Sequence, residues 1–180
     1  NAENLRFTGA GNLVAREARG RWYVLLNPDA YAQPDWLEAL VESAARHPQV
    51  RSFTSVQLAD DRPGYLDGLG DVMSIFGIPY RGGYLSPDQG QAREGEVFSP
   101  CGAAMMIDRA LFQGLGGFDE DFFCYGEDVD LGYRLQLADE PTLLVPGAVI
   151  RHVGSASTGG RKSEFAVFHG TRNRFWVLFK

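Results

Sequence analysis

The sequence is poor in cysteine and contains no long apolar run. Its 180 residues include two cysteines, Cys101 and Cys124, which do not form a metal-type pair. Two cysteines are too few for the disulfide scaffold of a small secreted protein, so we expect reduced, partly buried thiols and a cytoplasmic location. No apolar run is long enough to span a bilayer, and no signal peptide is recognisable. We therefore expect neither a disulfide-rich secreted protein nor a membrane-spanning one.

The chain also lacks an excess of positive charge. Its formal net charge is −6, with 44% hydrophobic and 22% charged residues, which is typical of a globular protein. A negative chain does not favour non-specific binding to nucleic acid, so we expect no nucleic-acid partner. Residues 151–180 differ, because they hold six basic residues and one acidic residue. This basic end suggests a surface that meets phosphate, either in a ligand or on a membrane.

Short apolar segments alternate with segments of helical periodicity. The pattern predicts strands at 21–26, 51–58, 103–107 and 143–150, and helices at 34–46, 108–112, 127–138 and 161–180. The last helix is predicted to be amphipathic, because aromatic residues recur in it at three- and four-residue steps. Residues 60–96 are rich in glycine and proline and predict a long loop or hairpin. The alternation predicts a single α/β domain over residues 1–180.

Two candidate metal ligands follow predicted strands. Asn27, Pro28 and Asp29 come directly after the strand at 21–26. Ligands of open α/β sheets bind at the carboxyl ends of strands, where a carboxylate suits Mg²⁺ or Mn²⁺ and a phosphate. The alternative is a simple turn, which the same residue types favour. His152 follows the strand at 143–150 and is a second candidate, although a lone histidine is more often structural.

An acidic cluster lies at the start of the helix predicted at 127–138. Glu127, Asp128 and Asp130 place three carboxylates within four residues. The helix dipole favours negative charge at this end, which is the structural explanation. Crowded like charges also raise the pKa of a carboxyl group, which suits a general base. The preceding aromatic residues, among them Phe123 and Tyr125, predict either a sugar-stacking wall or ordinary core.

Taken in order along the chain, these motifs resemble the family 2 glycosyltransferases of the GT-A fold, and especially the rhamnosyltransferase-like branch of bacterial polysaccharide enzymes. Residues 4–12 resemble the family's N-x-G-F-a-x-x-N segment, with Asn12 in register. The Asn27–Asp29 segment resembles the DxD-type motif, with asparagine in place of the first aspartate. Gly102 and Ala103 resemble the glycine-alanine segment below the acceptor site.

The second half of the chain continues the resemblance. Residues 116–120 lead to 127–131, which resemble the family's acidic catalytic motif. His152 matches the histidine after the next strand, and the Arg172–Asn173 pair matches a recurrent pair near the end of the domain. No single motif is decisive, but the ordered set is specific.

The resemblance implies a role for each matched residue. The fold would be a mixed GT-A sheet flanked by helices. Asp128 would be the general base, supported by Glu127, and Asp29 and His152 would hold Mn²⁺ or Mg²⁺. The donor would contact Asn12, Asn27, Asp29 and Arg172, and the acceptor would contact Gly102, Ala103, Phe123 and Tyr125.

The implied function is inverting transfer of a sugar from a nucleotide-diphosphate donor to a hydroxyl of a glycan or lipid-linked acceptor, in polysaccharide or cell-wall synthesis. The family's first nucleotide-binding strands do not precede Asn1. We therefore expect a fragment that is inactive or that pairs with another copy as a homodimer. Residues 161–180 predict either a helix in peripheral contact with the inner face of the plasma membrane or a core-facing helix with a solvated basic edge. The alternatives are a noncatalytic carbohydrate- or nucleotide-binding fragment and a metal-dependent phosphohydrolase.

Overall fold

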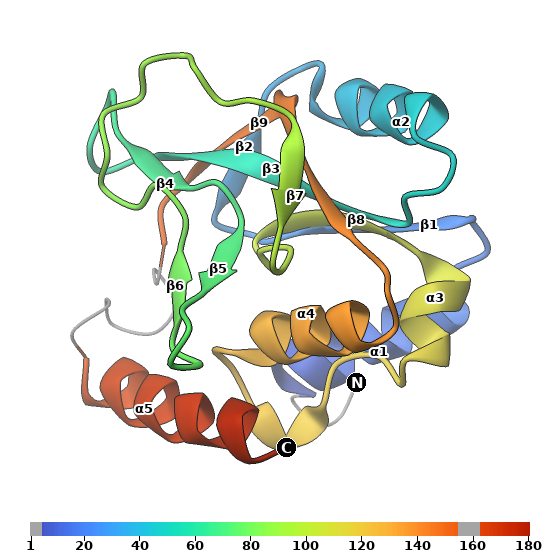
Figure 1. The fold of residues 1–180 in the computed structure, drawn as a ribbon, viewed down its shortest axis with the longest axis vertical. Coiled ribbons are helices and arrows are strands. Elements are labelled where there is room, and N and C mark those ends of the chain that lie inside the picture. The colour runs from blue at the N-terminus through green and yellow to red at the C-terminus, as the bar shows by residue number, and fades with distance from the viewer. Residues whose placement is uncertain (1–4, 155–162) are drawn as a thin grey trace.

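The computed structural model describes residues 5–154 and 163–180, which form a mixed β-sheet with helices on both faces (Figure 1). The elements in chain order are α1 (Arg6–Glu17), β1 (Trp22–Leu26), β2 (Ala30–Ala32), α2 (Trp36–Arg46), β3 (Ser52–Ala59), β4 (Leu66–Gly68), β5 (Asp71–Met73), β6 (Pro79–Arg81), β7 (Gly95–Val97), β8 (Ala104–Asp108), α3 (Arg109–Gly114), the 3₁₀ turn η1 (Glu120–Phe122), α4 (Glu127–Leu137), β9 (Thr142–His152) and α5 (Glu164–Phe179). The α/β class predicted from the sequence is confirmed.

The main sheet has the strand order β1-β8-β3-β9-β2, with β4 paired to β3 and β7 paired to β9. The neighbours β3 and β9 are parallel, whereas β8 is antiparallel to both β1 and β3. It follows that β1, β3 and β9 run in the same direction and end at the same edge of the sheet. This edge therefore gathers residues that follow three strands far apart in the sequence.

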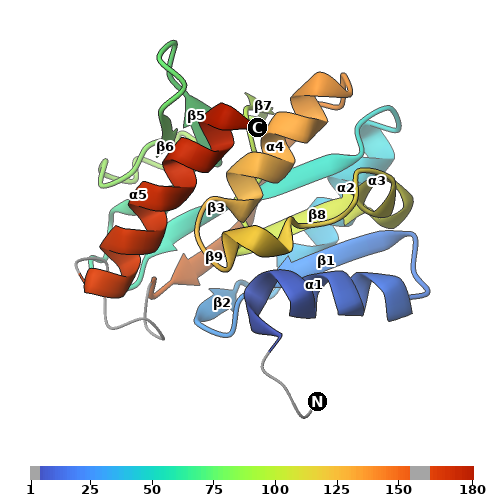
Figure 2. The same cartoon turned by 90° about the horizontal axis from the view of Figure 1, so that it is seen from below.

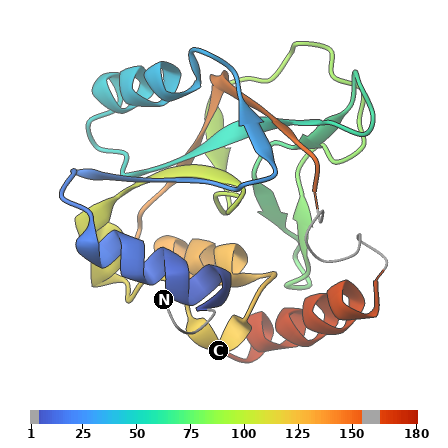
Figure 3. The same ribbon diagram turned by 180° about the vertical axis from the view of Figure 1, so that it is seen from behind.

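The two faces of the sheet bury different cores, and β8 shows how alternation separates them. Ala104 and Met106 pack in the core beneath α2. Met105 and Ile107 point the other way and pack against α1, α3 and α4. The views in Figures 1 and 3 show α2 alone on one side of the sheet and these other helices opposite it. All four β8 side chains are fully buried, so this strand is the centre of the fold.

The segment 60–96 is more ordered than a long loop. It contains β4, β5, β6 and the start of β7, and β5 and β6 form a hairpin in which Val72 faces Tyr80. Each of these strands is three residues long. Strands this short show no measurable period in a sequence, which explains why only a hairpin was predicted.

Helix α1 was not predicted, because Gly9 and Gly11 lower its helix propensity. Both glycines are buried, and a Cβ atom on Gly11 would lie 3.2 Å from the Phe118 ring and from the Tyr23 hydroxyl. The small residues therefore allow α1 to lie close to β1 and to the chain before η1. Packing at this contact outweighs the propensity of the isolated segment.

The C-terminal helix is present as α5, but the prediction that it is amphipathic is wrong. Its buried residues are Asn173 and Val177, whereas Phe168 and Phe179 are 61% and 85% exposed. Apolar residues such as Val167 occupy the side opposite the predicted aromatic stripe, so no face is purely polar. Residues 161 and 162 lie outside the described residues. In 5–154 and 163–180, no helix has both the length and the apolar character needed to cross a bilayer.

Candidate active site

A cleft of about 600 Å³ opens at the sheet edge where β1, β3 and β9 end. Asp29, Asp128 and His152 all line it, although they lie far apart in the sequence. Asn27 and Gly102 lie in the same lining. Figure 2 shows α4 and α5 next to each other in front of the sheet, and both helices contribute residues to the cleft lining. The three residues to which the resemblance assigns the base and the metal ligands therefore line one open cleft.

Sheet pairing brings Asp29 and His152 together. After β1 the chain turns into β2, which runs antiparallel to the end of β9 and pairs Ala30 with His152. The backbone N–H of Val153 donates to the carbonyl oxygen of Asp29 at 3.0 Å. As a result, Asp29 Oδ1 lies 3.5 Å from His152 Nε2. The Asn27–Asp29 segment is therefore a turn that places a carboxylate beside the His152 ring.

Two backbone amides hold the Asp128 carboxylate at the cleft. The N–H of Gly102 donates to Oδ2 at 2.9 Å, and the N–H of Val129 donates to Oδ1 at 2.9 Å. A Cβ atom on Gly102 would lie 3.4 Å from Asp128 Oδ2, which is a tight contact, so glycine eases the close approach. The neighbouring Ala103 accepts a hydrogen bond from the backbone N–H of Asn27 at 2.9 Å. The start of β8 thus connects α4 to the turn that carries Asp29.

Two further acids, Glu127 and Asp71, are buried in the cleft wall at 7% exposure each. Burial, followed by the charge of Asp128, raises the pKa of Glu127 to about 8, and its Oε2 has no hydrogen-bond partner among the described residues. Burial, again followed by the Asp128 charge, raises the pKa of Asp71 to about 8, although the Arg81 guanidinium opposes the rise. Burial and the Asp128 charge therefore both favour the protonated form of these two carboxyl groups.

Both cysteines also line the cleft, and both are free thiols. Burial is the main reason that the pKa of Cys101 rises to about 12 and that of Cys124 to about 11. Thiols with such pKa values carry almost no thiolate at neutral pH. The cleft therefore offers carboxylates and a histidine for chemistry, and no activated cysteine.

Sequence comparison identifies the family. A model of the family described as glycosyltransferase like family 2 matches residues 1–176. The chain belongs to glycosyltransferase family 2. The N-acetylglucosaminyl-diphospho-decaprenol L-rhamnosyltransferase of Mycobacterium tuberculosis H37Rv is 30% identical over 154 residues, which cover 77% of this chain and 48% of that protein. The O-antigen biosynthesis protein RfbC of Myxococcus xanthus is 30% identical over 143 residues, which cover 72% of this chain and 10% of that protein. The chain spans about half the length, or less, of these relatives.

Comparison with solved structures supports the same fold. The crystal structure of GalNAc-T7 with UDP, GalNAc and Mn²⁺ superposes with a TM-score of 0.68 at 15% sequence identity. The match covers 96% of this chain and 35% of that one. At this identity the likeness is one of fold, and it confirms the predicted GT-A architecture of this family 2 glycosyltransferase domain.

The residues at the cleft fit a divalent cation in this glycosyltransferase domain. Neighbouring ligands of an octahedral ion at about 2.1 Å lie roughly 3 Å apart, close to the Asp29–His152 separation of 3.5 Å. Within 5–154 and 163–180, no group of three or more acidic, histidine or cysteine side chains forms a complete site. Mg²⁺ and Mn²⁺ are commonly held by few protein ligands together with substrate phosphates and water. The pair therefore fits an ion that arrives with a diphosphate.

The structure does not support a donor-binding role for Asn12. Its side-chain amide donates to the carbonyl oxygen of Phe118 at 2.8 Å and to Glu120 at 3.0 Å, while its Oδ1 accepts from the N–H of Phe118 at 2.8 Å. Asn12 is buried and lies outside the cleft lining. It joins α1 to the chain before η1, so its place in the motif has a structural reason.

Arg172 is also turned away from the cleft, contrary to its predicted contact with phosphate. Its guanidinium donates to the carbonyl oxygen of Phe122 at 2.9 Å and stacks over the Trp176 ring. The neighbouring Asn173 is buried, and its amide nitrogen donates to the carbonyl oxygens of Phe122, Cys124 and Tyr125. The Arg172–Asn173 pair therefore holds the loop before α4. Arg174, from the same helix, does line the cleft.

That loop is held in a conformation that bulky residues seldom adopt. Phe123 and Tyr125 have positive φ values of 70° and 66°, which cost free energy unless surrounding contacts enforce them. The Phe123 ring stacks on His169 and lies outside the cleft lining, so the predicted acceptor contact through Phe123 is not supported. Tyr125 lies in the lining with Gly102 and Ala103, and their roles toward an acceptor stay predictions.

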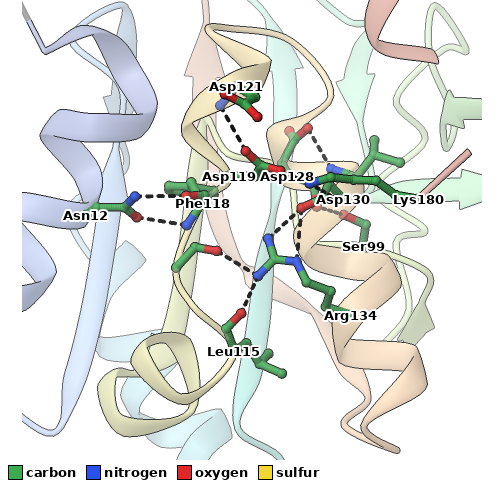
Figure 4. Close-up of polar contacts among 12 residues, drawn as sticks. Asn12, Ser99, Leu115, Phe118, Asp119, Asp121, Asp128, Asp130, Arg134 and Lys180 are labelled. Carbon is green, nitrogen blue, oxygen red and sulfur yellow. Dashed lines mark hydrogen bonds and ion pairs between the residues drawn. The ribbon is translucent and has the colours of Figure 1, made fainter. Parts of the chain in front are cut away.

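The acidic cluster of α4 divides between two sides of the helix. Figure 4 shows Asp130 facing Arg134, whose guanidinium nitrogens lie 2.6 and 3.0 Å from Asp130 Oδ2. Arg134 also donates to the carbonyl oxygens of Leu115 and Gly117. Asp130 is 4% exposed and lies outside the cleft lining. Glu127 and Asp128 remain the acidic residues of this motif that face the cleft.

Sequence reasoning missed three charged residues of segment 60–96. Asp71 and Arg81 line the cleft, and Asp67 lies behind them, fully buried, with its Oδ2 2.8 Å from His152 Nδ1. These residues belong to β4, β5 and β6, whose three-residue length gives no periodic signal. A charged residue in a strand this short is indistinguishable from a loop residue in the sequence alone.

Proposed function

We propose that this chain forms the catalytic site of an inverting glycosyltransferase, which moves a sugar from a nucleotide-diphosphate donor to an acceptor hydroxyl in the synthesis of a bacterial polysaccharide or cell-wall glycan. The observation that carries the proposal is the single cleft lined by Asp29, Asp128 and His152. Family membership supports it. The relative from M. tuberculosis is named a rhamnosyltransferase acting on a diphospho-decaprenol acceptor, so rhamnose and a lipid-linked acceptor are the first donor sugar and acceptor to test.

In this proposal Asp128 is the general base. Its carboxylate is anchored by two backbone amides and is partly open to the cleft, so it can meet an incoming hydroxyl. Asp128 accepts the hydroxyl proton as the acceptor oxygen attacks the anomeric carbon from the face opposite the leaving group. The glycosidic bond forms as the bond to the diphosphate breaks, which inverts the configuration. General-base assistance of this kind is worth about 10²–10⁴-fold in rate.

Asp29 and His152 would hold Mn²⁺ or Mg²⁺, which would supply positive charge against the diphosphate leaving group. Asn27 lies beside them in the cleft lining and is proposed to contact the donor. Arg174 replaces Arg172 as the proposed guanidinium that meets phosphate, because it lies in the cleft lining. Glu127, whose pKa is raised by burial and by the Asp128 charge, is proposed to donate a hydrogen bond to the acceptor or donor in its protonated form.

The deciding experiment is turnover of nucleotide sugars by the intact enzyme, with the anomeric configuration of the product determined by NMR. Inverted product with transfer to an acceptor supports the proposal. Release of phosphate without sugar transfer supports a phosphohydrolase instead. Binding of a sugar nucleotide without turnover supports a noncatalytic binding fragment.

Peripheral contact with the inner face of a membrane is a further part of the proposal. Phe168, Phe175 and Phe179 of α5 are exposed, Arg174 lies on the same helix, and Lys180 follows its last residue. Liposome flotation with and without anionic lipid tests this, with triple replacement of the three phenylalanines by serine as the comparison. Flotation that needs anionic lipid and these side chains supports membrane contact. Equal recovery in the soluble fraction contradicts it and favours cover by protein, including the proposed homodimer.

A further inference from the structure

A buried aspartate from segment 60–96 lies directly behind His152. Asp67 is the middle residue of β4 and has no exposed surface. β4 pairs with β3, whose last residues run alongside the end of β9. This places Asp67 Oδ2 2.8 Å from His152 Nδ1, on the side of the ring away from Asp29. The imidazole thus lies between two carboxylates that come from different parts of the chain.

The contact determines which ring nitrogen is available to a cation. A carboxylate accepts hydrogen bonds, so the short contact to Asp67 places the hydrogen of the neutral imidazole on Nδ1. The lone pair then lies on Nε2, the atom 3.5 Å from Asp29 Oδ1. A histidine that binds a metal commonly donates its other ring N–H to a carboxylate in this way.

Arg81 in turn fixes the aspartate. Its Nη1 donates to the same Asp67 Oδ2 at 2.6 Å, which offsets the cost of burying that charge. The side chain reaches Asp67 by passing over Gly68, where an added Cβ atom would lie 2.5 Å from Arg81 Cδ. Only a residue without a Cβ leaves room for this path. Gly68 and Arg81 therefore belong to the same arrangement.

We propose that Asp67 is a positioning residue for the metal ligand His152, held in place by Arg81. Asp67 orients the ring, keeps the hydrogen on Nδ1 and makes Nε2 a better ligand. This inference rests on the proposed function only in assigning a cation to Asp29 and His152. It gives segment 60–96 a defined part in the site, because Asp67 of this segment supports the proposed ligand His152.

The first test measures binding of Mn²⁺ alone, by the enhancement of water-proton relaxation. Asp67→Asn keeps the shape of the side chain and removes its charge, so we expect Mn²⁺ affinity to fall about 10–100-fold. Asp61→Asn is the matched control, because Asp61 is an exposed aspartate of the same segment, and its affinity should equal that of the wild type. Asp67→Asn affinity equal to that of the control would overturn the assignment.

A double-mutant cycle separates positioning from general damage to the fold. If Asp67 acts through His152, then Asp67→Asn has no further effect on Mn²⁺ affinity once His152→Ala is present. An equal fold-loss in both backgrounds would mean a merely structural role and would overturn the proposal. Sugar transfer is not measured in this cycle. An enzyme that obeys the cycle but transfers no sugar would therefore contradict the proposed function and leave the role of Asp67 standing.

A second measurement leaves both Asp67 and His152 unchanged. The chain has three histidines, so ring ¹⁵N spectra of labelled wild-type protein in saturating Mg²⁺ can be assigned with single substitutions at His47 and His169. We expect His152 to carry its hydrogen on Nδ1 and to bind through Nε2. A hydrogen on Nε2, or the absence of saturable binding of either cation by the wild-type protein, would overturn the assignment.

Discussion

Acidic residues lie on both sides of α4, but their surroundings differ in charge. On the side away from the cleft, Asp130 pairs with Arg134, and Lys180 pairs with both Asp119 and Asp130 (Figure 4). Two carboxylates there meet two basic side chains. On the cleft side, the lining contains four acids, Asp29, Asp71, Glu127 and Asp128, against the two arginines Arg81 and Arg174. The first region is balanced in charge and the second has an excess of acids.

This difference shows where to expect chemistry. In the balanced group, each acidic side chain pairs with a basic one, and these ion pairs stabilise the fold. An excess of acids in a confined cleft is costly, and it is relieved either by protonation or by a cation from outside. Both kinds of relief are indicated here, because Glu127 and Asp71 have pKa values raised to about 8, and Asp29 lies beside a histidine in a geometry that fits a divalent ion. The sequence motif alone treats Asp128 and Asp130 alike.

The strongest test of the comparison replaces the same residue type on each side of α4. In the intact enzyme we expect Asp128→Asn to lower turnover about 10²–10⁴-fold with donor binding nearly unchanged, because it removes the base. Asp130→Asn should leave turnover close to the wild-type value and lower the unfolding temperature, because its partner Arg134 loses an ion pair. Steady-state kinetics and thermal unfolding of both variants check this. Near-normal turnover of Asp128→Asn would rule out Asp128 as the base.

The next largest effect is expected at Asp29, the proposed metal ligand. If Asp29 binds the ion directly, replacing it should weaken Mn²⁺-dependent donor binding at least as much as losing a supporting residue would. We therefore expect Asp29→Ala to weaken this binding about 10–100-fold or more. Isothermal titration with a nucleotide sugar, with and without Mn²⁺, measures the difference. Asp61→Ala is the control and should bind as the wild type does. If donor binding by Asp29→Ala still depended on Mn²⁺ as in the wild type, the proposal that a cation offsets the excess of acids in the cleft through Asp29 would be contradicted.

Much of the fold could be predicted because its longer elements carry a period. The strands that became β1, β3, β8 and β9 and the helices α2 and α4 were predicted at or within about two residues of their bounds. The prediction failed where tertiary contacts decide the structure. α1 contains two glycines that are unfavourable in an isolated helix, and they are explained only by their contact with Phe118 and Tyr23.

The candidate site could also be predicted where its residues adjoin periodic strands and helices, and not elsewhere. Asp29 and His152 follow periodic strands, and Asp128 begins a periodic helix, so their convergence could be inferred from strand ends. The direction in which a side chain points could not be inferred. Arg172 and Arg174 are two residues apart on α5, and only the packing of this helix shows that Arg174, which lies outside the matched Arg172–Asn173 pair, lines the cleft. Asp67 was missed because its strand is three residues long.

The raised pKa of Glu127 predicts a pH-dependent stability that belongs to the cleft side. An acid with a folded-state pKa of about 8 and an ordinary value of 4.5 keeps its proton in the folded protein while the unfolded chain releases it. Glu127 should therefore lower the stability of the wild type as the pH rises from about 4.5 to about 8, and its contribution should level off above that. Glu127→Gln cannot ionise, so its loss over this window should be smaller by an amount on the order of a few kcal/mol or less.

Thermal unfolding of the wild type and Glu127→Gln across this pH window measures the effect. Asp139→Asn, at an exposed position beyond the end of α4, serves as the control and should follow the wild-type curve. Parallel curves for the wild type and Glu127→Gln would mean that Glu127 is ionised in the folded cleft. The excess of acids there would then need a bound cation even without a donor.

The smallest effect on function is expected from Asn12, which the sequence motif placed in the donor site and the structure places away from the cleft. Asn12→Ala removes the partner of the N–H and C=O groups of Phe118, so we expect a loss of about 1–3 kcal/mol in unfolding free energy. Donor affinity should stay at the wild-type value. Gln33→Ala, an exposed amide, should change neither quantity. If Asn12→Ala kept its stability but bound the donor weakly, the motif would be right and the division between a structural side and a cleft side would be wrong. If the unfolding free energy of Asn12→Ala falls while its donor affinity is unchanged, the hydrogen bonds between α1 and the chain before η1 explain why asparagine occurs in the motif.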